Sequence, residues 1–94
     1  MRARNTRKAL RDLKSLCRGH GLELTVVPGK GKGSHQGLLF RDPKTDESVS
    51  LTIAGSEDIS PGVQRSVLQY VRDLAARVAI AEILREIFED LFSG

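Results

Sequence analysis

The sequence has few of the residues from which disulfides and metal centres are built. It contains one cysteine and two histidines among 94 residues. A single thiol, Cys17, forms no disulfide within the chain, and neither histidine has a cysteine, histidine or carboxylate companion at the spacing of metal ligands. We therefore expect no metal site and no other cofactor, and we expect Cys17 to fill space in the core.

Long apolar runs are also missing. No stretch of about 18 apolar residues is present, and the basic N-terminus lacks the apolar segment of a secretory signal. We therefore expect no membrane association and a cytoplasmic location. With 39% apolar and 29% charged residues, the composition is that of a folded globular chain, and its length suffices for one core. We expect a single domain over residues 1–94, with its core at about 6–74 and a C-terminal extension at about 75–94.

Positive charge is concentrated in the first third of the chain. Residues 1–34 carry nine lysines or arginines against two acidic residues, whereas residues 35–94 carry six basic and ten acidic residues. Such asymmetry indicates a polyanionic partner that binds by phosphate neutralisation. We expect contacts with RNA from four residues in the first helix: Arg7, Lys8, Arg11 and Lys14. The alternative interpretation is a basic helix face that is simply solvated.

Apolar periodicity predicts the first half of the fold. A helix over about residues 6–18 carries its apolar residues on one face, at Leu10, Leu13, Leu16 and Cys17. Period-two alternation then predicts three strands, at residues 22–27, 34–41 and 48–53. The short turn between the last two strands favours an antiparallel meander.

Ser60 and Pro61 mark the start of a second helix. Together these elements predict an α+β fold of the double-stranded-RNA-binding type, in the order α-β-β-β-α. The two helices cover one face of a three-stranded antiparallel sheet and leave the other face open.

No helix breaker follows Pro61, so we expect one long helix to the C-terminus. About thirty residues would span roughly 45 Å, more than so small a sheet can cover. Six apolar residues near its end would then be exposed: Ile80, Ile83, Leu84, Ile87, Phe88 and Leu91. We favour a homodimer or partner contact through these residues, and the alternative is a helix that bends back onto its own domain.

The glycine- and lysine-rich segment at residues 29–33 leads directly to His35. Its spacing does not match a P-loop. RNA carries its own nucleophile, the 2′-hydroxyl, so cleavage needs only proton transfer and stabilisation of charge on the phosphate. We expect His35 to act as general acid or base, while Lys30, Lys32 and the amide of Ser34 hold the phosphate. The alternative is an exposed histidine at a strand end.

A family resemblance rests on the order of these motifs. Lys32-Gly33-Ser34-His35 follows a helix that ends in Gly-His-Gly-Leu and precedes Phe40-Arg41-Asp42-Pro43 and then Ile59-Ser60-Pro61-Gly62. Over roughly residues 7–72 this arrangement resembles the HicA family of mRNA interferase toxins. Two departures are an insertion at residues 28–31 and about twenty additional C-terminal residues.

The resemblance implies an activity and a partner. It implies a fold like that of double-stranded-RNA-binding domains, metal-independent endonucleolytic cleavage of mRNA, and inhibition by a HicB-like antitoxin protein that covers the active histidine. The family histidine aligns with His35, and the two residues before it with Gly33 and Ser34. Two other functions stay open: a non-catalytic RNA-binding module, and a dimeric interaction protein built on the long helix.

Overall fold

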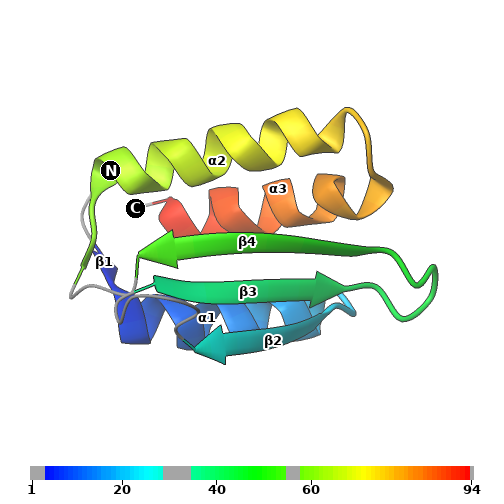
Figure 1. The fold of residues 1–94 in the computed structure, drawn as a ribbon, viewed down its shortest axis with the longest axis horizontal. Helices are drawn as coiled ribbons and strands as arrows, with labels where there is room; N and C mark the ends of the chain where they lie inside the picture. The colour runs from blue at the N-terminus through cyan, green and yellow to red at the C-terminus, as the bar shows by residue number, and fades with distance from the viewer. Residues whose placement is uncertain (1–3, 29–34, 55–57, 94) are drawn as a thin grey trace.

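The computed structural model describes residues 4–28, 35–54 and 58–93, which form an α+β architecture with a three-stranded antiparallel sheet and three helices (Figure 1). The elements, in chain order, are β1 (Arg4–Asn5), α1 (Thr6–Gly19), β2 (Glu23–Pro28), β3 (His35–Arg41), β4 (Ser48–Ala54), β5 (Asp58–Ile59), α2 (Pro61–Ala75) and α3 (Ala79–Phe92). In these ranges, no helix combines the length and the apolarity needed to cross a membrane.

Local signals at both ends explain the boundaries of α1. The side chain of Asn5 accepts a hydrogen bond from the backbone N–H of Lys8 at 3.2 Å, which satisfies one free donor of the first turn. After the helix, Gly21 adopts a φ of 76°, a left-handed conformation that glycine reaches without steric cost. The predicted helix is therefore confirmed, and Cys17 is buried in the core, as expected.

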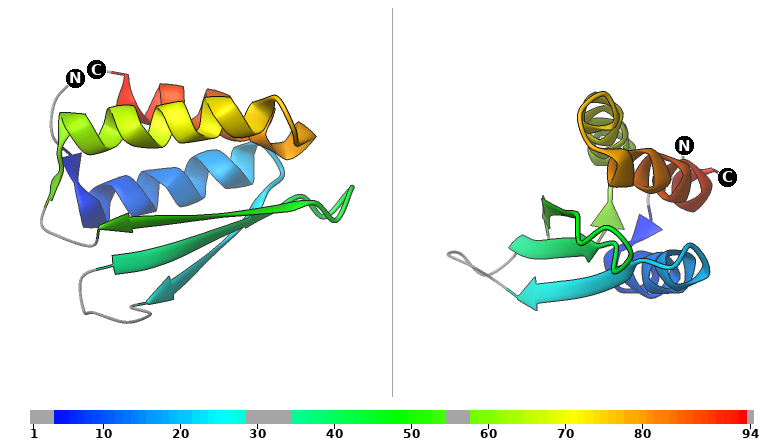
Figure 2. Two further views of the ribbon diagram at one scale, coloured as in Figure 1. Left: turned by 45° about the horizontal axis from the view of Figure 1, so that its top comes forward. Right: turned by 90° about the vertical axis from the view of Figure 1, so that its right-hand side faces the viewer.

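The sheet has the strand order β2-β3-β4, and the predicted meander is confirmed. Alternation sends one set of side chains towards the helices, including Leu38 and Phe40 of β3 and Val49 and Ile53 of β4. Figure 2 shows the helices on one side of the sheet, with α3 between α1 and α2. The opposite face of the sheet is left open, as the sequence predicts.

The prediction of one uninterrupted C-terminal helix is wrong. The chain forms a helical hairpin, because α2 ends at Ala75 and α3 begins at Ala79. At the break, Val78 has an extended backbone, with φ −134° and ψ 127°, and its N–H donates to the carbonyl oxygen of Leu74 at 3.0 Å. No glycine or proline causes the break. Packing of the apolar face of α3 against the rest of the chain outweighs local helix propensity.

This hairpin changes the interpretation of the six apolar residues proposed as a partner contact. Ile80, Leu84, Ile87, Phe88 and Leu91 are buried in the core of the chain itself, and Ile83 packs against that core partly buried. Their apolar surface is buried within one molecule, so the described residues do not form the exposed patch that favoured a homodimer. The alternative interpretation, in which the chain bends back, is the correct one.

Aromatic packing connects α3 to the sheet. The rings of Phe40 and Phe88 lie 5.9 Å apart at 75°, an edge-to-face arrangement, and Phe88 also meets Phe92 at 5.7 Å. Phe40 is completely buried. This cluster lies where α3 crosses the inner face of the sheet.

A short ribbon that the sequence does not predict joins the start of the chain to its middle. β1 pairs with β5 in antiparallel register, Arg4 with Ile59 and Asn5 with Asp58. In the sequence, β1 lies directly before α1, and β5 lies just before α2. The ribbon therefore fixes the N-terminal ends of both helices at the same end of the molecule.

Replacement of Phe88 by alanine is expected to destabilise the protein by about 3–5 kcal/mol, because it leaves a cavity between α3 and the sheet. Phe88→Leu, which keeps most of the volume, is expected to cost less than about 2 kcal/mol. Urea unfolding followed by circular dichroism measures both, with the exposed Glu86→Ala of the same helix as control. A Phe88→Ala protein as stable as the control would show that α3 does not pack as described.

Cys17 is expected to be unreactive in the native protein. Burial raises the pKa of its thiol to about 11, and the thiolate is the reactive form. A disulfide reagent at pH 8 should therefore modify it slowly in buffer and rapidly in urea. Because the unfolded thiol titrates near ~8.5, the stability that the protonated thiol contributes should be lost as pH rises from about 8.5 to 11. Rapid, stoichiometric modification without denaturant would contradict this burial.

Candidate functional site

The open face of the sheet carries a different set of side chains from the buried face. The strand register places these side chains in rows across the three strands. One row consists of Thr25, Leu39 and Ser50. The next row consists of Val27, Gly37 and Thr52. Leu39 is 38% exposed, which is unusual for a large apolar side chain in a strand. Short hydroxyl side chains of β4 lie beside it.

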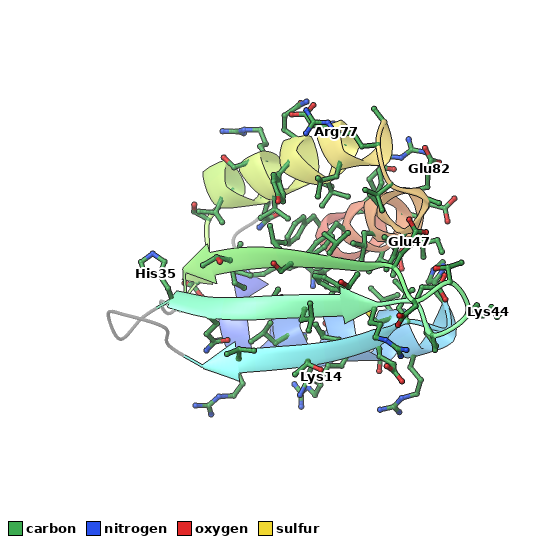
Figure 3. All side chains as sticks on the ribbon, turned by 45° about the vertical axis from the view of Figure 1, so that its right-hand side comes forward. Lys14, His35, Lys44, Glu47, Arg77 and Glu82 are labelled. Atoms are coloured by element: carbon green, nitrogen blue, oxygen red, sulfur yellow. The ribbon has the colours of Figure 1, made fainter. Side chains whose placement is uncertain are left out.

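His35 lies at one end of this face. It is the first residue of β3, pairs with Ala54 of β4, and is exposed. Figure 3 shows its ring at the start of β3, at the end of the sheet opposite Lys44 and Glu47. The imidazole is therefore accessible to a large substrate.

A hollow runs from His35 along the open face. This sheet-face groove has a volume of about 290 Å³. The outward-facing residues that line it are Val27, His35, Gly37, Leu39, Ser50 and Thr52. None of these six is acidic, so the groove does not repel a phosphate that approaches His35. The central depth coincides with Gly37, which has no side chain to fill it.

The far end of the face carries a cluster of ion pairs around Arg41. The guanidinium group of Arg41 donates to Glu23 at 2.9 Å and to Asp46 at 2.8 Å. Hydrogen bonds to Asp46 and then to Glu23 raise the pKa of Arg41. With two carboxylates on one guanidinium, this cluster carries net negative charge and is a poor phosphate site. Any phosphate chemistry on this face belongs at the His35 end.

The basic residues of α1 form a separate surface. Arg7, Arg11, Lys14 and Arg18 recur at spacings of four, three and four, which places them on one side of the helix, and Lys8 lies beside them. All five side chains are exposed. We call these five residues the basic stripe. Among the described ion pairs, none involves a member of the stripe, so their charges are available to an external anion.

The stripe and His35 do not form one cluster. Figure 3 shows Lys14 beyond the β2 edge of the sheet, away from His35. Only the first turn of α1, with Arg7 and Lys8, lies at the His35 end of the molecule (Figure 1). The structure therefore separates Arg11 and Lys14, two of the predicted phosphate-binding residues, from the predicted proton-transfer residue.

Four of the predicted phosphate-binding residues, Lys30, Lys32, Gly33 and Ser34, lie outside the described residues. The second histidine, His20, follows α1 at the opposite end of the molecule from His35 (Figure 1), and its N–H donates to backbone carbonyls of the last turn. The two histidines therefore do not act together. Over the parts of the chain that the structure describes, no group of three potential metal ligands occurs.

The groove was not predicted from the sequence. In the sequence, Val27, Leu39 and Gly37 are recognisable only as residues of predicted strands, and no motif marks them as the lining of a groove. The available signal was a glycine in the interior of a strand, which often marks a close approach of a ligand or another backbone.

Comparison of the chain with protein-family models, with curated proteins and with solved structures found no match. The resemblance to the HicA family therefore stays a prediction from the sequence.

Proposed function

We propose that this chain is an endoribonuclease that cleaves mRNA without a metal ion and uses His35 as its general acid or base. The observation that carries the proposal is the placement of His35, which is exposed at the end of a groove on the open sheet face. A histidine with this access can contact an RNA backbone from outside.

Cleavage of RNA requires only proton transfer and charge stabilisation from the protein. The 2′-oxygen of RNA attacks the adjacent phosphorus, the bond from phosphorus to the 5′-oxygen breaks, and the products are a 2′,3′-cyclic phosphate and a 5′-hydroxyl. One proton leaves the nucleophile and one joins the leaving group. A single imidazole transfers either proton, and nearby cations or amides stabilise the phosphorane charge. No oxidant, metal or cofactor is required.

The basic stripe supports an RNA substrate independently of His35. Exposed lysines and arginines release counterions when they neutralise phosphates, and this release supplies most of the sequence-independent affinity for nucleic acid. Because the stripe begins at the His35 end of the molecule, an RNA strand bound along α1 extends towards the groove. In the sequence, Lys30 and Lys32 add two positive charges shortly before His35.

The HicA-like interpretation adds a fold type and a partner to the proposal. The order of α1, the three-stranded meander and α2 is that of the double-stranded-RNA-binding type, and α3 adds a helix to it. In this interpretation the protein is a cytoplasmic toxin of a type II toxin–antitoxin system. A HicB-like antitoxin inhibits it by covering His35.

The first test incubates the purified chain with end-labelled mRNA in the presence of EDTA. Wild type is expected to cleave, and His35→Ala is expected to lose at least about 100-fold in rate, because it lacks the proton-transfer group. His20→Ala is the matched control, since it removes the other exposed histidine at the far end of the molecule, and it should cleave as wild type does.

The folding of the histidine variants is checked by urea unfolding. His35→Ala should lie within about 0.5 kcal/mol of wild type, since an exposed strand-end side chain contributes little packing. A folded His35→Ala that cuts RNA at the wild-type rate removes His35 from the mechanism. RNA binding without cleavage by any variant favours the non-catalytic RNA-binding module.

The second test measures the salt dependence of RNA binding. Replacing Arg11 and Lys14 together by alanine should weaken binding and lower the slope of log affinity against log salt by about one for each charge. The control is Arg72→Ala, since Arg72 is paired with Glu89 at 3.1 Å on the helical hairpin. An unchanged slope in the double variant would place the RNA interface elsewhere.

A further inference from the structure

The geometry points to a nucleobase site in the sheet-face groove: one unpaired base of the RNA substrate occupies the hollow over Gly37, between Leu39 and His35. This inference rests on the proposed ribonuclease function and adds what that function lacks, a means of choosing where to cut. Apart from His35, it concerns outward-facing residues that no part of the cleavage chemistry requires.

Gly37 is the first observation. It lies in the interior of the central strand, where glycine costs stability and offers no side chain for packing. Its φ is not positive, and a Cβ placed on it would meet its nearest atoms, in Val27, only at 3.6 and 3.7 Å, an ordinary contact. Neither backbone conformation nor crowding therefore requires glycine here. What glycine does provide is the depth of the groove.

The lining is the second observation. Val27, which pairs with Gly37 on β2, and Leu39, two residues along β3, present apolar surface to the hollow, while Ser50 and Thr52 bring hydroxyl groups from β4. Hydroxyls donate and accept hydrogen bonds, so they can pair with the polar edge of a base. Apolar walls with a few polar groups at one edge are typical of sites for small flat ligands. The acidic cluster around Arg41 lies at the other end of the face.

The size and position of the groove favour a single-stranded substrate. Its volume of about 290 Å³ is at the lower limit of small-molecule sites, which begin near ~300 Å³, so it accepts a group the size of a nucleoside and not a duplex. Bases in an A-form helix are stacked and paired, whereas unpaired bases can be turned out into a pocket. Because His35 also lines the groove, a base held there places its own ribose and phosphate beside the imidazole.

The test uses the full chain labelled with ¹⁵N and short 2′-O-methyl oligomers of each base, which lack the nucleophile and stay intact. Single-stranded oligomers are expected to shift the amide resonances of Gly37, Leu39 and Thr52, with one base giving the tightest binding. An A-form duplex of the same length should shift resonances of the basic stripe and leave the groove unchanged.

Two variants alter the groove itself. Gly37→Val fills the hollow with a residue that strands favour, so it should fold at least as stably as wild type while losing affinity for the preferred oligomer by about tenfold. Leu39→Gln removes an apolar wall without adding charge and should have a similar effect. Tyr70→Gln is the matched control, because among the described residues Tyr70 is the other large exposed apolar side chain, 43% exposed, and it lies on α2.

The outcomes separate this inference from the nuclease proposal. If wild type cleaves RNA and Gly37→Val cleaves the same sites at the same rate, the nuclease stands and the base site is overturned. If no variant cleaves but oligomers shift the groove resonances and Gly37→Val abolishes those shifts, the base site stands without the nuclease. Groove resonances that no oligomer moves, while the stripe responds, overturn the base site.

Discussion

The packing of α3 against the inner face of the sheet is the contact on which the rest of the structure depends. Phe88 meets Phe40 edge to face there, and α3 also touches α1 on one side and α2 on the other. A small three-stranded sheet offers apolar surface for little more than one helix layer. By turning back at residues 76–78, the chain places α3 in that layer, and α2 then packs mainly on α3. Without α3, α2 and the part of the inner sheet face that α1 does not cover would be exposed to water.

This arrangement on one side of the sheet decides what the other side can do. The inward-facing side chains of the sheet pack against the helices and form the core. The outward-facing side chains are therefore not needed for core packing. The open face accordingly carries Leu39 next to short hydroxyl residues, with the Arg41 ion-pair cluster at one end and His35 at the other. The strands of this face pack in the core through their other side, and a site built on strands holds a ligand in a more precise position than a site on a loop.

Local signals in the sequence were sufficient to predict the helices and strands but not how they pack together. Asn5, Ser60 and the alternation in β4 act within a few residues, so helix starts and strand faces could be predicted. The turn before α3 could not, because nothing between Ala75 and Ala79 breaks a helix locally and the gain comes from distant contacts with Phe40. His35 could be found because it follows a distinctive segment. The groove could not, since it exists only once Val27, Gly37 and Thr52 are in register across three strands.

The separation between the basic stripe and the groove has a consequence for recognition. Phosphates are the same in every RNA, so in the proposed function the charges of α1 would supply affinity and no choice among sequences. Single-strand binders often choose bases through aromatic side chains, yet among the described outward residues of the sheet there is no phenylalanine, tyrosine or tryptophan. In the proposed ribonuclease, discrimination on this face would come from shape and from the hydroxyls of β4. Gly37 gives the groove depth beside His35, so a base held there would also determine which phosphate reaches the imidazole.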